Sequence, residues 1–134
     1  MTTRTYIVTG SASGIGAATA QLLKERGNTV IGVDLRNAEV EADLSTPEGR
    51  QIAADRAVEL AGGTVDAVIA CAGISAPVPL TVSVNFFGVT GFLDRLAPVL
   101  ARSEAPRAVV VSSMASLQPN SPELVEALLA GDEP

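Results

Sequence analysis

The sequence has few of the residues that carry most acid-base and metal chemistry. Its 134 residues include no His and one Cys, Cys71. These absences exclude His-based catalytic triads, His-ligated zinc, clustered-cysteine metal sites and intrachain disulfides. The only Lys is Lys24 and the only Tyr is Tyr6. Proton transfer by this chain therefore depends on carboxylates, hydroxyls or that one lysine.

Positive charge and long apolar runs are also scarce. Fifteen acidic residues against nine basic ones give a net charge of -6. This charge argues against a positively charged surface that would bind nucleic acid or an anionic membrane. No apolar run approaches the roughly 20 residues of a spanning helix, and the first ten residues lack the apolar segment of a signal peptide. We therefore expect a cytoplasmic protein that binds neither nucleic acid nor membrane.

What the sequence does contain is a series of short apolar segments separated by helical patterns. Each apolar segment is nearly continuous, which is typical of a parallel sheet covered on both faces. Right-handed crossovers with the first strand central predict an α/β, Rossmann-like doubly wound sheet of five strands in the order 3-2-1-4-5. The predicted strands are Thr5–Thr9, Thr29–Asp34 and residues 40–44, 65–71 and 107–112. The first predicted helix follows the turn that begins at Gly10 and ends at Gly27. The other predicted helices span residues 47–61, 80–102 and 122–130.

A glycine-rich turn follows the first strand and opens the first helix. The first N–H groups of a helix are unpaired and attract anions. Gly10 allows a positive φ, while Gly14 and Gly16 leave room for a phosphate group and for the sheet. Ser11 and Ser13 add hydroxyl groups. The pattern predicts a phosphate-binding turn; a plain glycine-rich turn is the alternative.

Asp34 ends the second predicted strand. In a dinucleotide-binding fold, a carboxylate at this place accepts hydrogen bonds from the adenosine ribose hydroxyls and repels a 2′-phosphate. We therefore expect NAD to be preferred over NADP, although Arg36 weakens that preference. The alternative is that Asp34 is only a turn or cap residue.

At this point the residues resemble the short-chain dehydrogenase/reductase family. Thr9-Gly10-x-x-x-Gly14-Ile15-Gly16 matches the cofactor motif of that family, whose spacing differs from G-x-G-x-x-G. The resemblance extends along the whole chain and implies an oxidoreductase that transfers hydride between a nicotinamide cofactor and a carbonyl or secondary alcohol. Further matches in the family's order are Asp43-Leu44, Ala72-Gly73, Asn85 and Ser112-Ser113.

The resemblance implies a role for each matching residue. Asn85 would bend its helix and hold a water in a proton relay, and Ser113 would hydrogen-bond the substrate oxygen and stabilise the transition state. The alternatives are a plain polar residue in a helix for Asn85, and loop hydroxyls or Ser116 in place of Ser113. The implied cofactor residues are Gly10, Ser13, Gly14, Ile15 and Gly16 at the pyrophosphate, Asp34 at the ribose, Asp43 and Leu44 at the adenine, and Ala72 and Gly73 along the cofactor.

Three segments further resemble the bacterial 3α-hydroxysteroid dehydrogenase/carbonyl reductase branch of the family. They are GVDLRNAEVEADLSTPEGR, ACAGIS and VSVNFFGVTGFLD. This resemblance implies a steroid as one possible small-molecule substrate. One local departure is Cys71, where many family members have Asn; a buried structural Cys is the expected reading, with a reactive thiol as the alternative.

The larger departure concerns the Tyr-x-x-x-Lys pair that the family uses for proton transfer. Tyr6 lies in the first predicted strand and Lys24 on the exposed side of the first helix, so neither supplies it. We therefore expect residues 1–134 to be an NAD(P)-binding Rossmann domain incomplete at its carboxyl end, and inactive alone because general acid-base catalysis is worth about 100- to 10,000-fold. We also expect the fifth strand to be an uncovered edge that makes the isolated chain poorly stable.

The long helix of residues 80–102 predicts a partner surface. Val82, Val89 and Leu96 belong to one apolar stripe, and Gly88 and Phe92 lie on a second apolar edge. A helix that is apolar on two sides is usually buried on two sides, and in the resembled family a second subunit covers this helix. We therefore expect a homo-oligomer, with the final helix packing either on its own domain or beside a substrate loop.

Two other functions stay open from the sequence. One is a non-catalytic dinucleotide-binding or interaction module that ends naturally at Pro134; a stop codon there would favour it, whereas a reading frame that continues into Tyr-x-x-x-Lys would favour the enzyme. The other is a nucleotide-sugar epimerase or dehydratase, which the glycine spacing disfavours. The substrate itself is not identified, because few pocket residues fall within this sequence.

Overall fold

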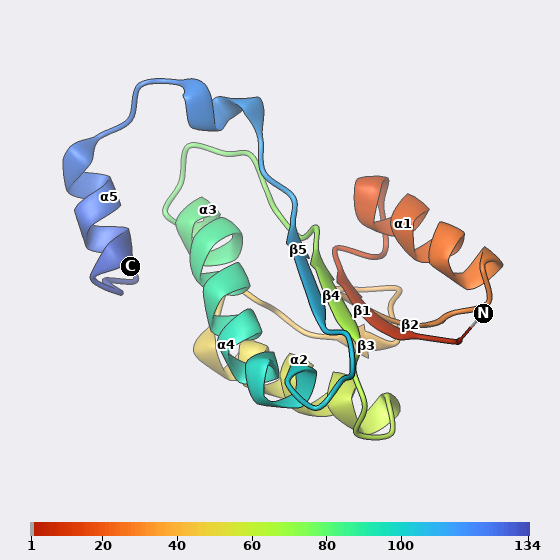
Figure 1. Cartoon of the computed structure of the whole chain (residues 1–134). Helices are drawn as coiled ribbons and strands as arrows, with labels where there is room; N and C mark the ends of the chain where they lie inside the picture. Colours follow the sequence, from red (N-terminus) through yellow and green to blue (C-terminus); the bar gives the residue numbers. More distant parts are fainter. Residues whose placement is uncertain (1) are drawn as a thin grey trace.

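The computed structural model describes residues 2–134, and its centre is a parallel sheet with helices on both faces (Figure 1). Five strands pair in the order β3-β2-β1-β4-β5, which confirms the predicted doubly wound order. All four strand pairings are parallel. The strands are β1 (Thr5–Thr9), β2 (Thr29–Asp34), β3 (Val40–Glu41), β4 (Ala67–Ala70) and β5 (Arg107–Val110).

Helices cover the two faces of the sheet unequally. In Figure 1, α1 lies on one side of the sheet, and α2 and α4 lie together on the other. None of the described helices is long and apolar enough to cross a bilayer. The helices are α1 (Gly14–Glu25), α2 (Pro47–Leu60), α3 (Leu80–Val82), the π-helix η1 (Ser83–Phe87), α4 (Gly88–Leu100), the 3-10 helix η2 (Met114–Leu117) and α5 (Pro122–Leu129).

The core is split by the sheet into a large and a small cluster. Successive strand residues point to opposite faces, so Ile7 of β1 joins the large cluster under α2 and α4, whereas Val8 joins the small cluster under α1. Phe92 and Leu96 of α4 are fully or almost fully buried in the large cluster. The central strands are thus covered on both faces, as their continuous apolar sequences predict.

The helix boundaries follow local signals. The Thr46 hydroxyl accepts a hydrogen bond from the Gly49 N–H at 3.0 Å and caps α2, with Pro47 at its first position. Gly27 follows α1 with φ +84°, which only glycine adopts readily.

The fourth and fifth strands are shorter than predicted, at Ala67–Ala70 and Arg107–Val110, and two further differences lie near the site. The third strand spans only Val40–Glu41 instead of residues 40–44, because Asp43 turns the chain away from the sheet and its carboxylate accepts the Ser45 N–H at 2.9 Å. The long helix of residues 80–102 contains a π-helical turn at Ser83–Phe87. Both irregularities lie beside the candidate site described below.

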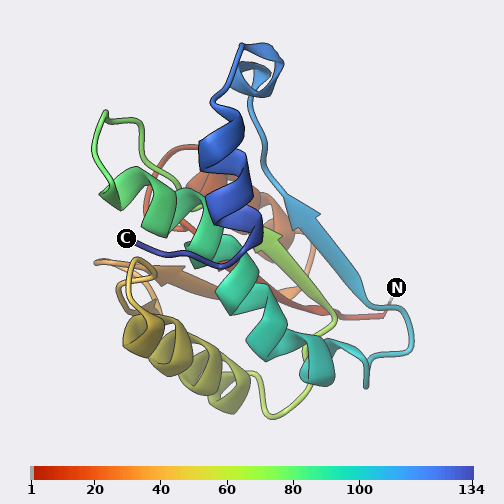
Figure 2. The ribbon, with the colours of Figure 1, turned by 90° about the vertical axis from the view of Figure 1, so that its left-hand side faces the viewer.

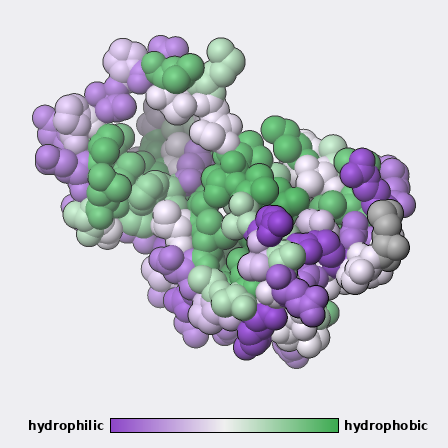
Figure 3. Space-filling model, viewed as in Figure 1, coloured by the Kyte–Doolittle hydropathy of each residue, from purple (hydrophilic) through white to green (hydrophobic). Residues whose placement is uncertain are grey.

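The carboxyl-terminal part of the structure is much more exposed than the rest. No described residue after Leu100 is buried, and Val109 of β5 is 51% exposed. An apolar surface over β5 is visible in the space-filling view (Figure 3). The fifth strand is therefore an uncovered sheet edge, as expected.

Candidate functional site

The glycine turn follows the carboxyl end of β1 and leaves no room for a Cβ at Gly10 or Gly16. Gly10 has φ +68°, and a Cβ there would lie 2.8 Å from the Ala72 backbone nitrogen. A Cβ on Gly16 would lie 2.1 Å from the Gly10 carbonyl oxygen, while Gly14 needs glycine for its φ of +56°. Such close backbone approach exposes the start of α1 to a ligand.

The beginning of α1 has donors to offer to an anion. Ser13 is the N-cap residue, its side chain makes no capping hydrogen bond, and the first turn contains no acidic residue. Ser13 and the adjacent Ile15 are both exposed. The first backbone N–H groups of α1 and the Ser13 hydroxyl can therefore face a phosphate group.

Asp34 joins the end of β2 to the glycine turn. Its Oδ2 accepts the Ala12 N–H at 3.0 Å and its Oδ1 accepts the Leu35 N–H at 2.7 Å. Asp34 thus does serve as a turn residue, which was the alternative reading. Because an ionised carboxylate has about four acceptor positions, it keeps capacity for ribose hydroxyls as well.

A cavity of about 240 Å³ opens beside these residues at the carboxyl ends of β2 and β4. Crevices at this place, where the strand order reverses around β1, are where doubly wound sheets bind their ligands. The cavity brings together six of the predicted cofactor residues from four separate loops: Ser13, Asp34, Asp43, Leu44, Ala72 and Gly73.

Asn85 lies in the π-helix and clamps the loop after β4. Its side-chain amide donates to the Ile74 carbonyl and its Oδ1 accepts the Ile74 N–H, both at 2.8 Å. A Cβ on Gly73 would lie 3.2 Å from Asn85 Oδ1. Since Gly73 and Ile74 line the cavity, Asn85 shapes its wall, whereas its predicted role in a water relay stays a prediction.

Thr9 begins the motif quoted above, but sequence reasoning assigned it no role in the site. It is 2% exposed, and its hydroxyl oxygen accepts the N–H groups of Cys71 and Ala72, each at 3.1 Å. This bond pair fixes the backbone of β4 at the cavity. The available signal was a Thr at the end of a buried strand, directly before the first motif glycine.

Cys71 is partly buried against the small core cluster. Burial raises the pKa of its thiol above the ordinary value, so the reactive thiolate is disfavoured. This environment agrees with a structural Cys.

Ser113 lies after β5 and is not among the residues that line the cavity. It is exposed, and its hydroxyl accepts the Ala115 N–H at 3.1 Å as the N-cap of η2. Ser112 and Ser116 are exposed as well. The cavity therefore gathers six of the ten predicted cofactor residues, and neither Ser113 nor Gly10, Gly14, Ile15 and Gly16 is among its lining residues.

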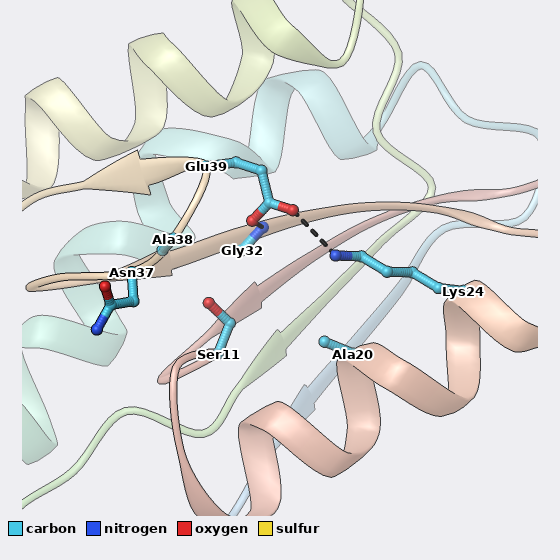
Figure 4. Close-up of a pocket in the computed structure, with 7 residues that line it drawn as sticks. All are labelled: Ser11, Ala20, Lys24, Gly32, Asn37, Ala38 and Glu39. Atoms are coloured by element: carbon cyan, nitrogen blue, oxygen red, sulfur yellow. Dashed lines mark hydrogen bonds and ion pairs between the residues drawn. The ribbon is translucent and has the colours of Figure 1, made fainter.

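Tyr6 and Lys24 are both remote from this cavity. Tyr6 lies in β1 against the small cluster, and Lys24 Nζ forms an ion pair with Glu39 Oε1 at 3.0 Å (Figure 4). Burial alone would raise the pKa of Glu39, but hydrogen bonds from Lys24 and from the Gly32 N–H outweigh burial and lower it. The ion pair connects α1 to the loop before β3, and each of the two charged groups has the other as its partner.

A second cavity of about 440 Å³ lies on the α1 side of β2, around this ion pair. Ser11 is among its lining residues, and the Ser11 hydroxyl is buried without a hydrogen-bond partner. Figure 4 shows Ser11 between the end of β1 and the Glu39 loop. Within residues 2–134, no group of three or more Cys, Asp or Glu side chains is arranged to hold a metal ion.

A parallel sheet with a glycine turn after its central strand and a carboxylate at the end of the next strand defines a dinucleotide-binding domain. The sequence model of one family, described as short chain dehydrogenase, matches residues 4–124. The chain belongs to this family of oxidoreductases.

Two relatives show which branch the chain resembles. It is 41% identical over 132 residues to the 3-alpha-hydroxysteroid dehydrogenase/carbonyl reductase of Comamonas testosteroni, covering 95% of this chain and 51% of that protein. It is 39% identical over 110 residues to a coniferyl-alcohol dehydrogenase of a Pseudomonas species, covering 73% of this chain and 42% of that protein. The chain thus spans about half the length of the curated relatives it matches.

A solved structure agrees with this placement. The 3-alpha-hydroxysteroid dehydrogenase from Pseudomonas sp. B-0831, complexed with NADH, is 50% identical and superposes with a TM-score of 0.90. The match covers 96% of this chain and 57% of the other. These findings confirm the expected family and the hydroxysteroid-dehydrogenase-like branch.

Proposed function

We propose that this chain is the cofactor-binding portion of an NAD(H)-dependent oxidoreductase that interconverts a carbonyl compound and a secondary alcohol. One arrangement carries the proposal: Gly10 and Gly16 leave no space for a Cβ at the start of α1, and Ser13, the N-cap of α1, lines the same cavity as Asp34. The names of its relatives favour a steroid as substrate.

The residues present fit a dinucleotide. Gly10, Gly14 and Gly16 form a cradle that Cβ atoms would fill or strain, and α1 presents unpaired N–H groups to a pyrophosphate. Asp43 and Leu44 line the cavity wall where an adenine would lie. Bound NAD(H) would supply or accept the hydride, while the residues of this chain bind and orient it.

Proton transfer needs groups that the cavity does not contain. No described Tyr or Lys side chain lines it, so we propose that a Tyr and a Lys outside residues 1–134 manage the proton in the whole enzyme. In this proposal Ser113 hydrogen-bonds the substrate oxygen, and Asn85 holds a relay water. The 134 residues alone would then bind cofactor without turnover.

Titration of the protein with NADH and NADPH tests the cofactor proposal. We expect NADH to bind more tightly, because Asp34 repels a 2′-phosphate, and Asp34→Asn to reduce the difference. Asp55→Asn, at an exposed position of α2, is the matched control and should change nothing. Tighter binding of NADPH by the unmodified protein would overturn the proposed preference.

The competing function is a non-catalytic dinucleotide-binding module. The full-length protein, incubated with NADH and a 3-ketosteroid, distinguishes the two. We expect NADH oxidation in proportion to ketone reduction. Tight NADH binding without oxidation, across a panel of cyclic and aliphatic ketones, would support the module instead.

The helix of residues 80–102 provides a weaker argument for assembly than its sequence suggested. The second apolar edge needs no partner, because Gly88 and Phe92 are buried within the chain itself. The partly exposed Val89 and Leu93 leave a smaller apolar surface. We retain homo-oligomerisation through this helix as a proposal, and a monomeric mass in light scattering would contradict it.

A further inference from the structure

Arg50 in α2 is a charged side chain in an unusual place. The residue is 4% exposed, although a buried guanidinium is costly unless its donors are all engaged. Its Nε donates to the Leu44 carbonyl at 2.8 Å, and its Nη2 donates to the Ser45 and Ser83 carbonyls at 3.2 Å each. One side chain therefore binds two separate backbone segments.

Residues of both segments line the proposed cofactor cavity. Leu44 and Ser45 line the wall assigned above to the adenine. Ser83 begins the π-helix, whose next residue, Val84, also lines the cavity, and Asn85 in turn clamps Ile74. Arg50 lies behind the cavity and is hydrogen-bonded to both walls.

Three glycines make this arrangement possible. A Cβ on Gly91 of α4 would lie 3.0 Å from Arg50 Cδ, and one on Gly88 would lie 3.2 Å from the carbonyl oxygens of both Leu44 and Ser83. A Cβ on Gly49 would lie 1.7 Å from a carbonyl oxygen of the same loop. The sequence thus keeps side chains out of the space around the arginine.

The charge of Arg50 is balanced from the far end of the chain. Both carboxylate oxygens of Glu133 accept hydrogen bonds from the guanidinium, one of them from Nη1 at 3.0 Å. In Figure 2 the segment that follows α5 crosses α4 to reach this place. Glu133 supplies the countercharge, whereas the contacts to the cavity walls come from the three carbonyl groups.

We propose that Arg50 is a positioning residue that holds the adenine loop, residues 43–45, and the π-helix carrying Asn85 in one fixed relation. This inference rests on the proposed cofactor site and adds the side chain that unites its two walls. Lys in its place is a point charge without the planar fork that reaches several carbonyls at once. A neutral side chain leaves all three carbonyls without their donor.

Hydrogen-deuterium exchange on the full-length, cofactor-free protein tests the coupling directly. We expect Arg50→Met to speed exchange about tenfold in residues 43–46 and 83–87 together, with β1 and α1 unchanged. Arg50→Lys should restore part of the protection. Arg56→Met is the control, because Arg56 lies on the same helix with a 59% exposed side chain.

Glu133→Gln separates the wall contacts from the countercharge. It should speed exchange in α5 while leaving residues 43–46 and 83–87 within about twofold of the unmodified protein, since the carbonyl contacts remain. If Arg50→Met does not fold, Arg50→Lys carries the test. Faster exchange in only one of the two segments, or equally throughout the molecule, would overturn the inference.

Cofactor binding provides the second measurement. We expect the Kd for NADH to rise about tenfold in Arg50→Met and to stay unchanged in Arg56→Met. An unchanged Kd in Arg50→Met would overturn the positioning role. If the unmodified protein binds no NADH, the proposed function fails, and the exchange experiment still decides whether Arg50 couples the two segments.

Discussion

The part of the chain from β1 to α4 and the part from β5 to α5 are held together in different ways. The first part contains every buried residue of the described structure, including Phe92 and Leu96 of α4. The second part buries none and is attached through the β4–β5 ladder and the contact of Arg50 with Glu133. Tight packing therefore coincides with the proposed cofactor site, whereas the region after Ser113 contains no buried residue.

Truncation of a core leucine gives the largest expected contrast between the two parts. Leu96→Ala removes a side chain with no exposed surface and should lower the free energy of unfolding by about 2 to 5 kcal/mol. Leu129→Ala, at a 78% exposed position of α5, should cost less than about 0.5 kcal/mol. Urea titration measures both; equal losses would show that α5 belongs to the same packed unit.

Gly16→Ala should cost about 1 to 3 kcal/mol and abolish NADH binding, because the added Cβ meets the Gly10 carbonyl at 2.1 Å. Gly62→Ala is the matched variant, since Gly62 has φ +71° but open space around it. It should lose only about 1 kcal/mol and bind NADH normally. Urea titration and NADH titration together check this, and retained binding by Gly16→Ala would contradict the assigned phosphate turn.

Thr9→Val keeps the shape of a buried side chain but removes its hydroxyl. The N–H groups of Cys71 and Ala72 would lose their acceptor, so we expect a loss of about 1 to 3 kcal/mol together with weaker NADH binding. Thr9→Ser, which keeps the hydroxyl, should preserve binding better than Thr9→Val. Equal binding by the two variants would remove Thr9 from the site.

The smallest expected effect is the pH dependence of the attachment through Glu133. The hydrogen bond from Arg50 holds the pKa of Glu133 below its ordinary value of 4.5. A lowered folded-state pKa means that the contribution to stability is present above pH 4.5 and is lost as the pH falls through the folded-state pKa. Glu133→Gln should flatten the stability profile only in that acidic range, which thermal unfolding at several pH values would show.

The order of the sheet could be predicted because its evidence is local and repeated. Apolar runs such as Ile7 and Val8 in β1 alternate with helical patterns, and right-handed crossovers then leave few topologies. Asp34 was likewise predictable, since the end of a strand after a glycine turn fixes its place. Asp43, Leu44, Ala72 and Gly73 were predicted only through the family resemblance, and they line a cavity at the carboxyl ends of the strands, where doubly wound sheets bind ligands.

The residues that sequence reasoning missed act over long distances in the chain. Arg50 reads as a surface charge of a helix, and nothing near it in sequence shows that the Ser83 carbonyl and Glu133 converge on it. The sequence predicts Phe92 at a partner surface, because Phe92 lies off the apolar stripe that is expected to face the sheet. In the structure α4 also packs on α2, which buries that second edge.

The π-helical turn at Ser83–Phe87 lets one continuous helix present side chains to two different parts of the molecule, the cavity and the large core cluster. A wide turn holds an extra residue, and each residue adds about 100° of rotation in an α-helix. Leu80 and Val84 can therefore face the cavity while Phe92 and Leu96 face the large core cluster. Deleting one residue from Ser83–Phe87 would rotate all of α4 about its own axis and turn its apolar side chains away from the sheet, although the composition of the helix would hardly change.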